Sequence, residues 1–450
     1  MNVEKNKSYT VKGSGLHLVH FLLSVLIFLA MFEQYYIKWY IGGFYPKRTF
    51  VVLAIFTVVF LFLIRAYDAY DVGVDTVMGL FFGQSLCDLI TDVIIYGAIC
   101  LLWTSLMNPI PLLATLAIQI LLNLIWSYLA NRWYFKKNSN LPSIVLYSDS
   151  DKLKVLQNIT MFDEKYDVKE YINVTKISKT DLEFIKDYKV VFVIDLDEEI
   201  RNIVLKECIE HNVRCLAMPH IGDVMLMGGK HVKNCYAPLY MVERANFSLE
   251  YAFLKRAFDF IVCLVALIVL SPVFLITAIA IKLEDRGPAF YRQTRLTKDG
   301  REFEIIKFRS MRVDAEKDGV ARLSTENDDR ITKVGSFIRK CRIDELPQLI
   351  NILKGEMSIV GPRPERPEIA AEYEKELEAF SARLQVKAGL TGYAQVYGKY
   401  NTNPYQKLLM DLMYINTMSS LTDLKIMFAT VRILFEKESS EGIDDGERTA

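Results

Sequence analysis

The segment FIVCLVALIVLSPVFLITAIAI, residues 260–281, decides the architecture of the C-terminal half of this chain. It is apolar over twenty-two residues, and Ser271-Pro272 interrupts it at its centre. A proline inside a helix removes one backbone hydrogen bond and forces a kink. The sequence therefore predicts two apolar helical halves that meet at a break at Ser271 and Pro272.

Basic residues flank this segment on both sides. Lys255 and Arg256 precede it, and Lys282 and Arg286 follow it. Basic residues gather on the cytoplasmic side of membrane proteins, so two basic ends favour a re-entrant helix, over residues 257–283, that returns to the side it entered. A kinked fifth crossing is the alternative. We expect Lys255 and Arg256 to contact anionic lipid headgroups.

Composition narrows the class of protein. The 450 residues suggest about three domains. Lys plus Arg balance Asp plus Glu, 54 against 54, so bulk charge does not point to nucleic acid. The seven cysteines form no Cys-x-x-Cys pair and the histidines form no His-Glu-x-x-His, so neither a disulfide framework nor a zinc site is predicted.

Four apolar segments that could cross a bilayer, which takes about 20 residues, precede the Ser-Pro segment; the second is short and needs flanking residues to complete it. We predict a polar tail over residues 1–16, without a cleavable signal, and a four-helix transmembrane domain over residues 17–137. A cytoplasmic N-terminus places seven Lys and Arg residues inside and three outside, which favours that orientation and puts the later domains in the cytoplasm. The predicted spans are residues 18–36, 50–64, 86–107 and 109–130.

Residues 140–245 alternate short apolar runs with helical patterns, which indicates a small parallel sheet in a Rossmann-like domain. The first strand runs into Tyr147-Ser148-Asp149-Ser150 and lacks Gly-x-Gly-x-x-Gly, so we predict no dinucleotide site and favour a structural or regulatory role. The predicted strands are residues 143–147, 190–194 and 213–217, and the predicted helices are residues 151–159 and 196–211.

Residues 250–435 mix charged strands and helices, and residues 436–450 form an acidic tail. We predict strands over residues 288–292 and 302–308 and a helix over residues 346–353. In that interpretation Asp344 caps the helix and Pro347 lies in its first turn. The fold class is thus a membrane protein of mixed α/β type: four transmembrane helices, a Rossmann-like domain, and an α/β domain with a re-entrant helix.

Two charged motifs carry the chemistry. Asp344-Glu345 follows a cluster of cations that includes Arg339, and Pro362-Arg363-Pro364 comes shortly after it. Carboxylates, guanidinium groups and a divalent ion are what phosphoryl transfer requires. A plain helix cap with an acidic first turn is the competing interpretation. Beside a broken membrane helix, the motifs indicate chemistry on a phosphate that a lipid carries.

An ordered series of motifs over residues 255–431, about 40% of the chain, resembles the bacterial sugar transferases, which are polyprenyl-phosphate hexose-1-phosphate transferases. The layout upstream is similar to the large form that initiates exopolysaccharide or O-antigen synthesis. The matching blocks are Lys255-Arg256 with Asp259, Ser271-Pro272, Gly287-Pro288, Tyr291-Arg292-Gln293, Lys307-Phe308-Arg309-Ser310-Met311, Asp344-Glu345-Leu346-Pro347-Gln348, Gly361-Pro362-Arg363-Pro364, Gly389-Leu390-Thr391-Gly392, and Asp411 with Asp423.

The resemblance implies transfer of a hexose-1-phosphate from a UDP-sugar to undecaprenyl phosphate, with loss of UMP. This is the first membrane step of exopolysaccharide, capsule or O-antigen synthesis at the cytoplasmic face of the bacterial inner membrane. It further implies Asp344 as the nucleophile, Glu345 as the residue that orients or deprotonates, and Mg²⁺ held by this pair. Lys307, Arg309, Arg339, Pro362, Arg363 and Pro364 would bind phosphates, and Asp411 and Asp423 would support the site.

Two other classes compete. A membrane-bound NDP-sugar dehydratase or epimerase needs a glycine-rich loop and a catalytic Tyr-x-x-x-Lys, but Tyr251 and Lys255 form the only such pair, at the membrane entry. A non-catalytic scaffold or regulator of glycan assembly remains open, since the upstream half could do that alone. That half shows no evident chemistry and is compatible with a homodimer. The motifs leave the identity of the sugar open.

Overall fold

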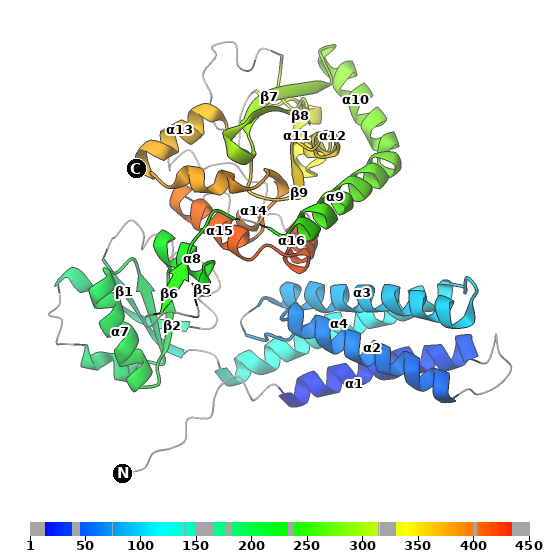
Figure 1. Cartoon of the computed structure of the whole chain (residues 1–450), viewed down its shortest axis with the longest axis horizontal. Helices are drawn as coiled ribbons and strands as arrows, with labels where there is room; N and C mark the ends of the chain where they lie inside the picture. The colour runs from blue at the N-terminus through cyan, green and yellow to red at the C-terminus, as the bar shows by residue number, and fades with distance from the viewer. Residues whose placement is uncertain are drawn as a thin grey trace. The chain divides into compact units, whose positions relative to one another are not determined.

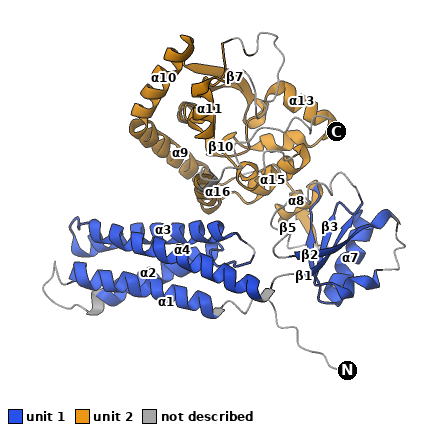
Figure 2. Cartoon of the chain, turned by 180° about the vertical axis from the view of Figure 1, so that it is seen from behind, with its two compact units in different colours: residues 1–220 blue, residues 221–450 orange. Residues whose placement is uncertain are grey.

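The computed structural model describes residues 14–37, 46–73, 75–138, 141–148, 166–176, 182–232, 238–245, 247–313, 315, 330–398 and 403–433. The chain divides into two compact units, Met1–His220 and Ile221–Ala450, which Figure 2 colours separately. Most of the predicted N-terminal tail and all of the predicted acidic tail lie outside the described residues.

The first unit begins with four apolar helices: α1 (Ser14–Met31, continued as a π-helix over Phe32–Ile37), α2 (Pro46–Ala66), α3 (Val77–Trp103) and α4 (Ile110–Asn138). Each is long and apolar enough to cross a membrane, which confirms the four predicted segments (Figure 1). The predicted start of the third segment at residue 86 was wrong. The helix begins at Val77 because the Thr76 hydroxyl caps it, accepting from the Gly79 amide at 3.0 Å.

The rest of the first unit contains a four-stranded parallel sheet of order β2-β1-β3-β4. Apolar residues cover both faces of its central strands, as a parallel sheet requires. The predicted parallel sheet is therefore confirmed, whereas β2 was missed because its sequence, YDVKEYIN, is charged and half-exposed. The predicted helix over residues 151–159 lies outside the described residues. The elements are β1 (Leu141–Tyr147), β2 (Tyr166–Asn173), β3 (Val190–Ile194), α7 (Glu198–Glu210) and β4 (Arg214–Ala217).

The boundary between the compact units falls inside the predicted 140–245 domain. Helix α8 (Ile221–Met227) belongs to the second unit and packs against α15 (Pro404–Asn416), where the Asn416 side-chain amide donates to Val224 O at 2.6 Å. The short antiparallel pair β5 (Lys230–Val232) and β6 (Leu239–Met241) follows. Residues after His220 therefore pack with the C-terminal elements.

The apolar Ser-Pro segment forms two helices, α9 (Leu249–Val269) and α10 (Ser271–Asp285), that meet at 61°. The Ser271 hydroxyl donates to Ile268 O at 2.8 Å, and Pro272 occupies the first turn of α10, where its missing amide costs nothing. The chain thus breaks at the predicted dipeptide, and Figure 1 shows the bent pair along one side of the second unit.

The remaining elements of the second unit are small. An antiparallel hairpin pairs β7 (Phe290–Leu296) with β8 (Glu302–Phe308), and a short parallel pair joins β9 (Ser358–Val360) to β10 (Gly389–Thr391). These confirm a mixed α/β unit, with the first predicted strand shifted by several residues. The helices are α11 (Lys333–Lys340), α12 (Gln348–Lys354), α13 (Pro367–Glu376), α14 (Tyr393–Tyr397), α15 and α16 (Ser420–Ile433).

Candidate active site

The Asp344-Glu345 pair lies in a single 3₁₀ turn, Ile343–Glu345, between α11 and α12. Helix α12 starts at Gln348, with Pro347 as its cap residue and no side-chain cap hydrogen bond. The prediction that Asp344 caps this helix was therefore wrong, because the turn separates it from the helix by three residues. Both carboxyl groups are left for other partners.

Glu345 is surrounded by cations. Its Oε1 lies 3.0 Å from Lys307 Nζ and 3.1 Å from Arg363 Nη2, and its Oε2 lies 3.7 Å from Arg342 Nη1. Burial alone would raise the pKa of Glu345, but the charges of Lys307, Arg363 and Arg342 outweigh it and hold the pKa well below its usual range. Glu345 is therefore ionised at every physiological pH and ties strand β8 to the loop that carries Arg363.

Asp344 has the opposite character. Within the described ranges, no hydrogen bond or ion pair reaches its carboxyl group. Burial and the neighbouring charge of Glu345 raise the pKa of Asp344 to about 6, against the opposing charges of Lys307, Arg339 and Arg363. Two adjacent carboxyl groups whose pKa values are driven apart are a feature of catalytic sites. Asp344 is the member whose oxygens are available to react.

The Pro362-Arg363-Pro364 loop presents its arginine to this turn. Both prolines are buried, while the Arg363 side chain is 44% exposed and reaches Glu345. The chain enters the loop through Gly361, where an added Cβ would lie 2.4 Å from Lys387 O. Only glycine permits that approach, so buried prolines and a close backbone crossing hold Arg363 in place.

Arg383, which the sequence analysis did not single out, holds this loop through its backbone. Its Nη2 donates to Arg363 O at 2.9 Å, and its Nε and Nη2 reach Asp411 Oδ2 at 2.8 and 2.7 Å. The Arg383 side chain is 3% exposed and that of Asp411 1%. Asp411 therefore acts on the site through Arg383. The sequence offered only a lone arginine in a turn, with no sign of its partner 28 residues away.

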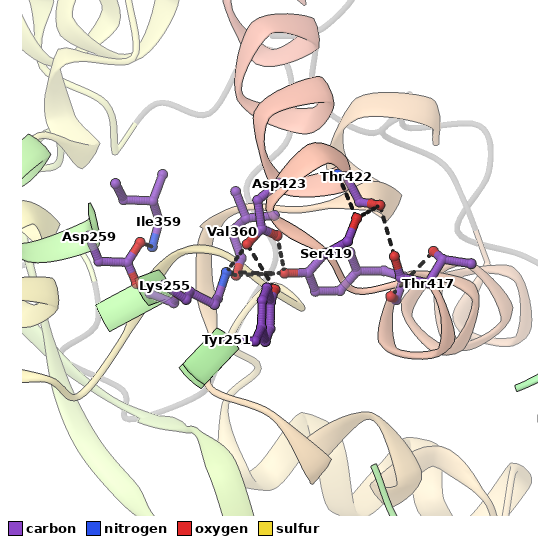
Figure 3. A network of polar contacts seen from close by, with 11 residues as sticks. Tyr251, Lys255, Asp259, Ile359, Val360, Thr417, Ser419, Thr422 and Asp423 are labelled. Carbon is purple, nitrogen blue, oxygen red and sulfur yellow. Dashed lines mark hydrogen bonds and ion pairs between the residues drawn. The ribbon is translucent and has the colours of Figure 1, made fainter. Parts of the chain in front are cut away.

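Figure 3 shows the second support, centred on Asp423. Lys255 Nζ lies 2.7 Å from Asp423 Oδ2 and donates to Val360 O at 3.2 Å. The hydroxyls of Tyr251 and Tyr414 also reach Asp423, at 3.0 and 2.7 Å. The expectation that Lys255 contacts headgroups was wrong, since its side chain turns inward. Asp423 instead anchors the strand that leads into the Pro-Arg-Pro loop.

Arg256 and Asp259 extend this support along α9. Arg256 donates to Ile352 O at 2.6 Å and, through Nη2, to Leu353 O at 2.8 Å, at the C-terminal end of α12. Arg256 therefore also turns away from the headgroups expected for it. Asp259 accepts from the Ser358 hydroxyl at 2.7 Å (Figure 3 shows its contact with the Ile359 amide). The first half of α9 thus holds both segments that carry the candidate residues.

The predicted phosphate-binding cations are not all brought together. Lys307 and Arg363 contact Glu345 directly, and Arg339 lies near enough to lower the pKa of Asp344. Arg309 instead pairs with Asp285 at the end of α10 and is 7% exposed. Its role in phosphate binding stays a prediction, and the structure places it beside the broken helix.

A magnesium ion fits this donor set in one particular way. The described residues contain no group of three His, Cys, Asp or Glu side chains that could hold a metal. Mg²⁺ is commonly held by one or two carboxylates together with substrate phosphates and water. Asp344, with no partner among the described residues, suits that arrangement. Glu345 suits it less, because cations already occupy both of its oxygens.

Comparison with known proteins places the site within a recognised region. Residues 250–437 match the family model described as "Bacterial sugar transferase". The chain is 41% identical over 187 residues to UDP-N-acetylgalactosamine-undecaprenyl-phosphate N-acetylgalactosaminephosphotransferase of Aeromonas hydrophila, covering 41% of this chain and 44% of that protein. It is 44% identical over 183 residues to UDP-glucose:undecaprenyl-phosphate glucose-1-phosphate transferase of Escherichia coli K12, covering 40% and 39%.

A third relative is shorter. The exopolysaccharide production protein PSS of Rhizobium leguminosarum bv. phaseoli is 40% identical over 187 residues, covering 40% of this chain and 93% of that protein. The match thus spans less than half of the first two relatives but nearly all of the third. In each case the shared part is about the size of the second unit's matched region, which contains the Asp344-Glu345 turn and the Pro-Arg-Pro loop.

Proposed function

The chain belongs to the bacterial sugar transferase family, and from this we propose that it transfers a sugar-1-phosphate from a UDP-sugar to undecaprenyl phosphate and releases UMP. The names of the relatives from A. hydrophila and E. coli state such a substrate pair. One observation carries the proposal for this chain: the carboxyl group of Asp344, which has no partner among the described residues, lies beside the ion-paired cluster of Lys307, Glu345 and Arg363. Asp344 would thus supply the nucleophile, next to cations that are already held in place to bind phosphate.

In the first step, an ionised Asp344 oxygen attacks the sugar-bearing phosphorus of the UDP-sugar. The bond from that phosphorus to the bridging oxygen breaks, and the bridging oxygen leaves with its electron pair as part of UMP. An aspartyl phosphosugar remains. Lys307 and Arg363 neutralise charge on the phosphate oxygens as the negatively charged carboxylate approaches.

In the second step, a phosphate oxygen of undecaprenyl phosphate attacks the same phosphorus. The acyl–phosphate bond breaks and returns its electron pair to Asp344. One phosphoanhydride has replaced another, so the exchange lies near energetic balance. Glu345 keeps its charge throughout, because its pKa is held low, and it therefore orients Lys307 and Arg363 rather than accepting a proton. When bound by Asp344 and substrate phosphates, Mg²⁺ would supply further charge neutralisation.

The same proposal places both soluble parts on the cytoplasmic side, with α9 and α10 re-entrant. Cys341 is exposed, and Glu210 is exposed upstream of α9. We would label Cys341 alone, and a Glu210→Cys variant alone, in an otherwise cysteine-free chain, using intact spheroplasts and inverted vesicles. Labelling of both positions in inverted vesicles alone supports the re-entrant arrangement. Labelling from opposite sides would establish a fifth crossing. A homodimer stays a prediction.

The reaction itself is tested by UMP release from the purified full chain in nanodiscs, with Mg²⁺, undecaprenyl phosphate and a panel of UDP-sugars. Because the relatives' names include both glucose and N-acetylgalactosamine, the panel contains UDP-glucose, UDP-galactose and their N-acetylated forms. We expect release with one donor and its loss in Asp344→Asn. Equal release by the variant would remove Asp344 as the nucleophile. Folded protein that releases no UMP from any donor would favour the scaffold alternative.

A further inference from the structure

Polar side chains lie inside the four-helix bundle of the first unit in a regular register. The Ser127 hydroxyl donates to Gln84 Oε1 at 3.3 Å, and Asn123 Nδ2 donates to Asp88 Oδ2 at 2.7 Å. From the first contact to the second, the residue number rises by four in α3 and falls by four in α4. This is expected for antiparallel helices that keep one face toward each other. One further turn places Asp92 of α3 opposite a residue four before Asn123.

That residue is Gln119, and α1 contributes to the same level. Trp126 Nε1 donates to Leu16 O at 3.1 Å, and His20 Nε2 lies 2.9 Å from Asn123 Oδ1. One turn beyond His20, α1 presents Ser24. Ser24 and Gln119 are fully buried and Asp92 is 3% exposed. Three helices of the bundle, α1, α3 and α4 (labelled in Figure 1), therefore direct polar side chains to one level of its interior.

The two successive levels differ in their hydrogen bonds. Asn123 joins His20 on one side to Asp88 on the other. Gln119 occupies the corresponding place one turn away, yet in the described part of the chain its amide oxygen and nitrogen have no partner. The hydroxyl of Ser24, both carboxyl oxygens of Asp92 and one oxygen of Asp88 are equally unpartnered within the described residues.

Such a cluster is costly in a membrane-spanning bundle. An unsatisfied polar group there costs several kcal/mol, and an intramembrane carboxyl group normally marks a functional site. Among the described side chains of the bundle, no lysine or arginine is buried to offset Asp88 and Asp92. The unpartnered atoms are five oxygens and one amide nitrogen, contributed from three helices. The five oxygens suit an occupant that is positive and prefers oxygen, whereas the Gln119 amide nitrogen is a donor and takes no part in holding it.

We propose that a hard monovalent cation of the Na⁺ type binds between α1, α3 and α4, held by Ser24, Asp92 and Gln119 with Asp88 beside them. Carboxylate, amide and hydroxyl oxygens replace the water of such an ion. A transition metal is a poor match, because no three His, Cys, Asp or Glu side chains group together in the described ranges. The site is separate from the candidate active site and does not depend on the proposed reaction.

The test is equilibrium binding of ²²Na⁺ to the purified full chain in phosphatidylcholine nanodiscs, with choline replacing Na⁺. We expect saturable binding of about one ion per chain and affinity reduced about tenfold or more in Asp92→Asn. Glu33→Gln, which alters a half-buried carboxyl group at the end of the first membrane helix, is the matched control and should bind as the wild type does.

A second variant and a second measurement guard against misfolding. Gln119→Met removes a neutral ligand without changing charge and should also weaken binding. The wild-type Tm should rise with Na⁺, and this rise should be reduced in both variants. Folded wild type that binds no Na⁺ saturably between pH 6 and 9 would overturn the proposal in favour of protonated carboxyl groups. Undiminished binding in both variants would overturn the assigned location.

Discussion

Lys307 and Glu345 join strand β8 to the 3₁₀ turn Ile343–Glu345 through an ion pair, 3.0 Å from Nζ to Oε1. Glu345 accepts from Arg363 with the same oxygen, so one carboxylate fixes two cations that come from different elements. The Glu345 side chain is only 12% exposed. Removal of the Glu345 carboxylate takes the negative charge away from Lys307, whose side chain is only 20% exposed.

We expect Glu345→Gln to lower the free energy of unfolding by about 3 kcal/mol, because breaking the mostly buried pair with Lys307 leaves the ammonium charge of Lys307 uncompensated. UMP release should fall by about a hundredfold or more, as Lys307 and Arg363 lose their orientation. The control is Glu304→Gln, which breaks a 3.3 Å ion pair with Arg292. The Glu304 and Arg292 side chains are 63% and 65% exposed, so this substitution should lower the free energy of unfolding by less than about 1 kcal/mol. Equal effects of the two substitutions would contradict the anchoring role.

The pH dependence of the first step reports on Asp344. Its pKa is raised to about 6, and only the ionised form can attack phosphorus, so the rate should rise with pH through about 6 and level off above 7. The measurement is the single-turnover burst of UMP with UDP-sugar and Mg²⁺ but no acceptor. Omitting undecaprenyl phosphate removes the titration of the acceptor. A rate already level at pH 4.5 would show that Asp344 ionises normally or does not attack.

The raised pKa also makes a prediction about stability. A carboxyl group that binds its proton more tightly in the folded state destabilises the fold once it ionises. The free energy of unfolding should therefore fall as pH rises from about 4 to 6. The difference between about 6 and the ordinary 3.8 corresponds to about 3 kcal/mol. Asp344→Asn should therefore raise the Tm at pH 8 and leave it nearly unchanged near pH 4. A variant less stable than the wild type at pH 8 would refute this.

Lys255→Met separates two roles for this residue. The Lys255 and Asp423 side chains are 15% and 11% exposed. Breaking their contact should lower the free energy of unfolding by about 3 kcal/mol in nanodiscs of any lipid composition. A headgroup anchor would instead show its effect only with anionic lipid. Lys282→Met, at an exposed site near the end of α10, is the control and should change the Tm little. If Lys255→Met lowers stability only in nanodiscs with anionic lipid, Lys255 contacts headgroups after all.

Arg383 should behave as a positioning residue. Arg383→Lys keeps the charge beside Asp411, but a single ammonium cannot also replace the guanidinium contact with Arg363 O. We expect kcat to fall by about ten- to a hundredfold with a small change in Tm, because the contact with Arg363 O is lost while a positive charge stays beside Asp411 and Glu365. Arg383→Met should lower stability as well. If kcat in Arg383→Lys is unchanged, the contact with Arg363 does not position the loop.

Much of the architecture could be predicted from local patterns. The strand over residues 190–194 and the hairpin strand over residues 302–308 were predicted with their observed bounds, since apolar runs and alternation reflect burial directly. The helix break was also predictable, since Pro272 acts through its own backbone. Strand β2 was not, because its charged sequence is stabilised by pairing with β1, a contact that a local window does not contain.

The features of the candidate site likewise divide into those predictable from local sequence and those set by contacts between distant residues. Local motifs already reveal the residue types: two adjacent carboxyl groups, a rigid arginine loop, and an apolar helix broken at Ser271-Pro272. The folded chain, through contacts between distant segments, neutralises Glu345 with cations and leaves Asp344 without a partner among the described residues. It likewise turned Lys255 inward to Asp423 and made Arg383 the support of Arg363. Charge interactions and hydrogen bonds act over a few ångströms of space but join residues up to 192 positions apart in the chain, so a local window of sequence does not contain them.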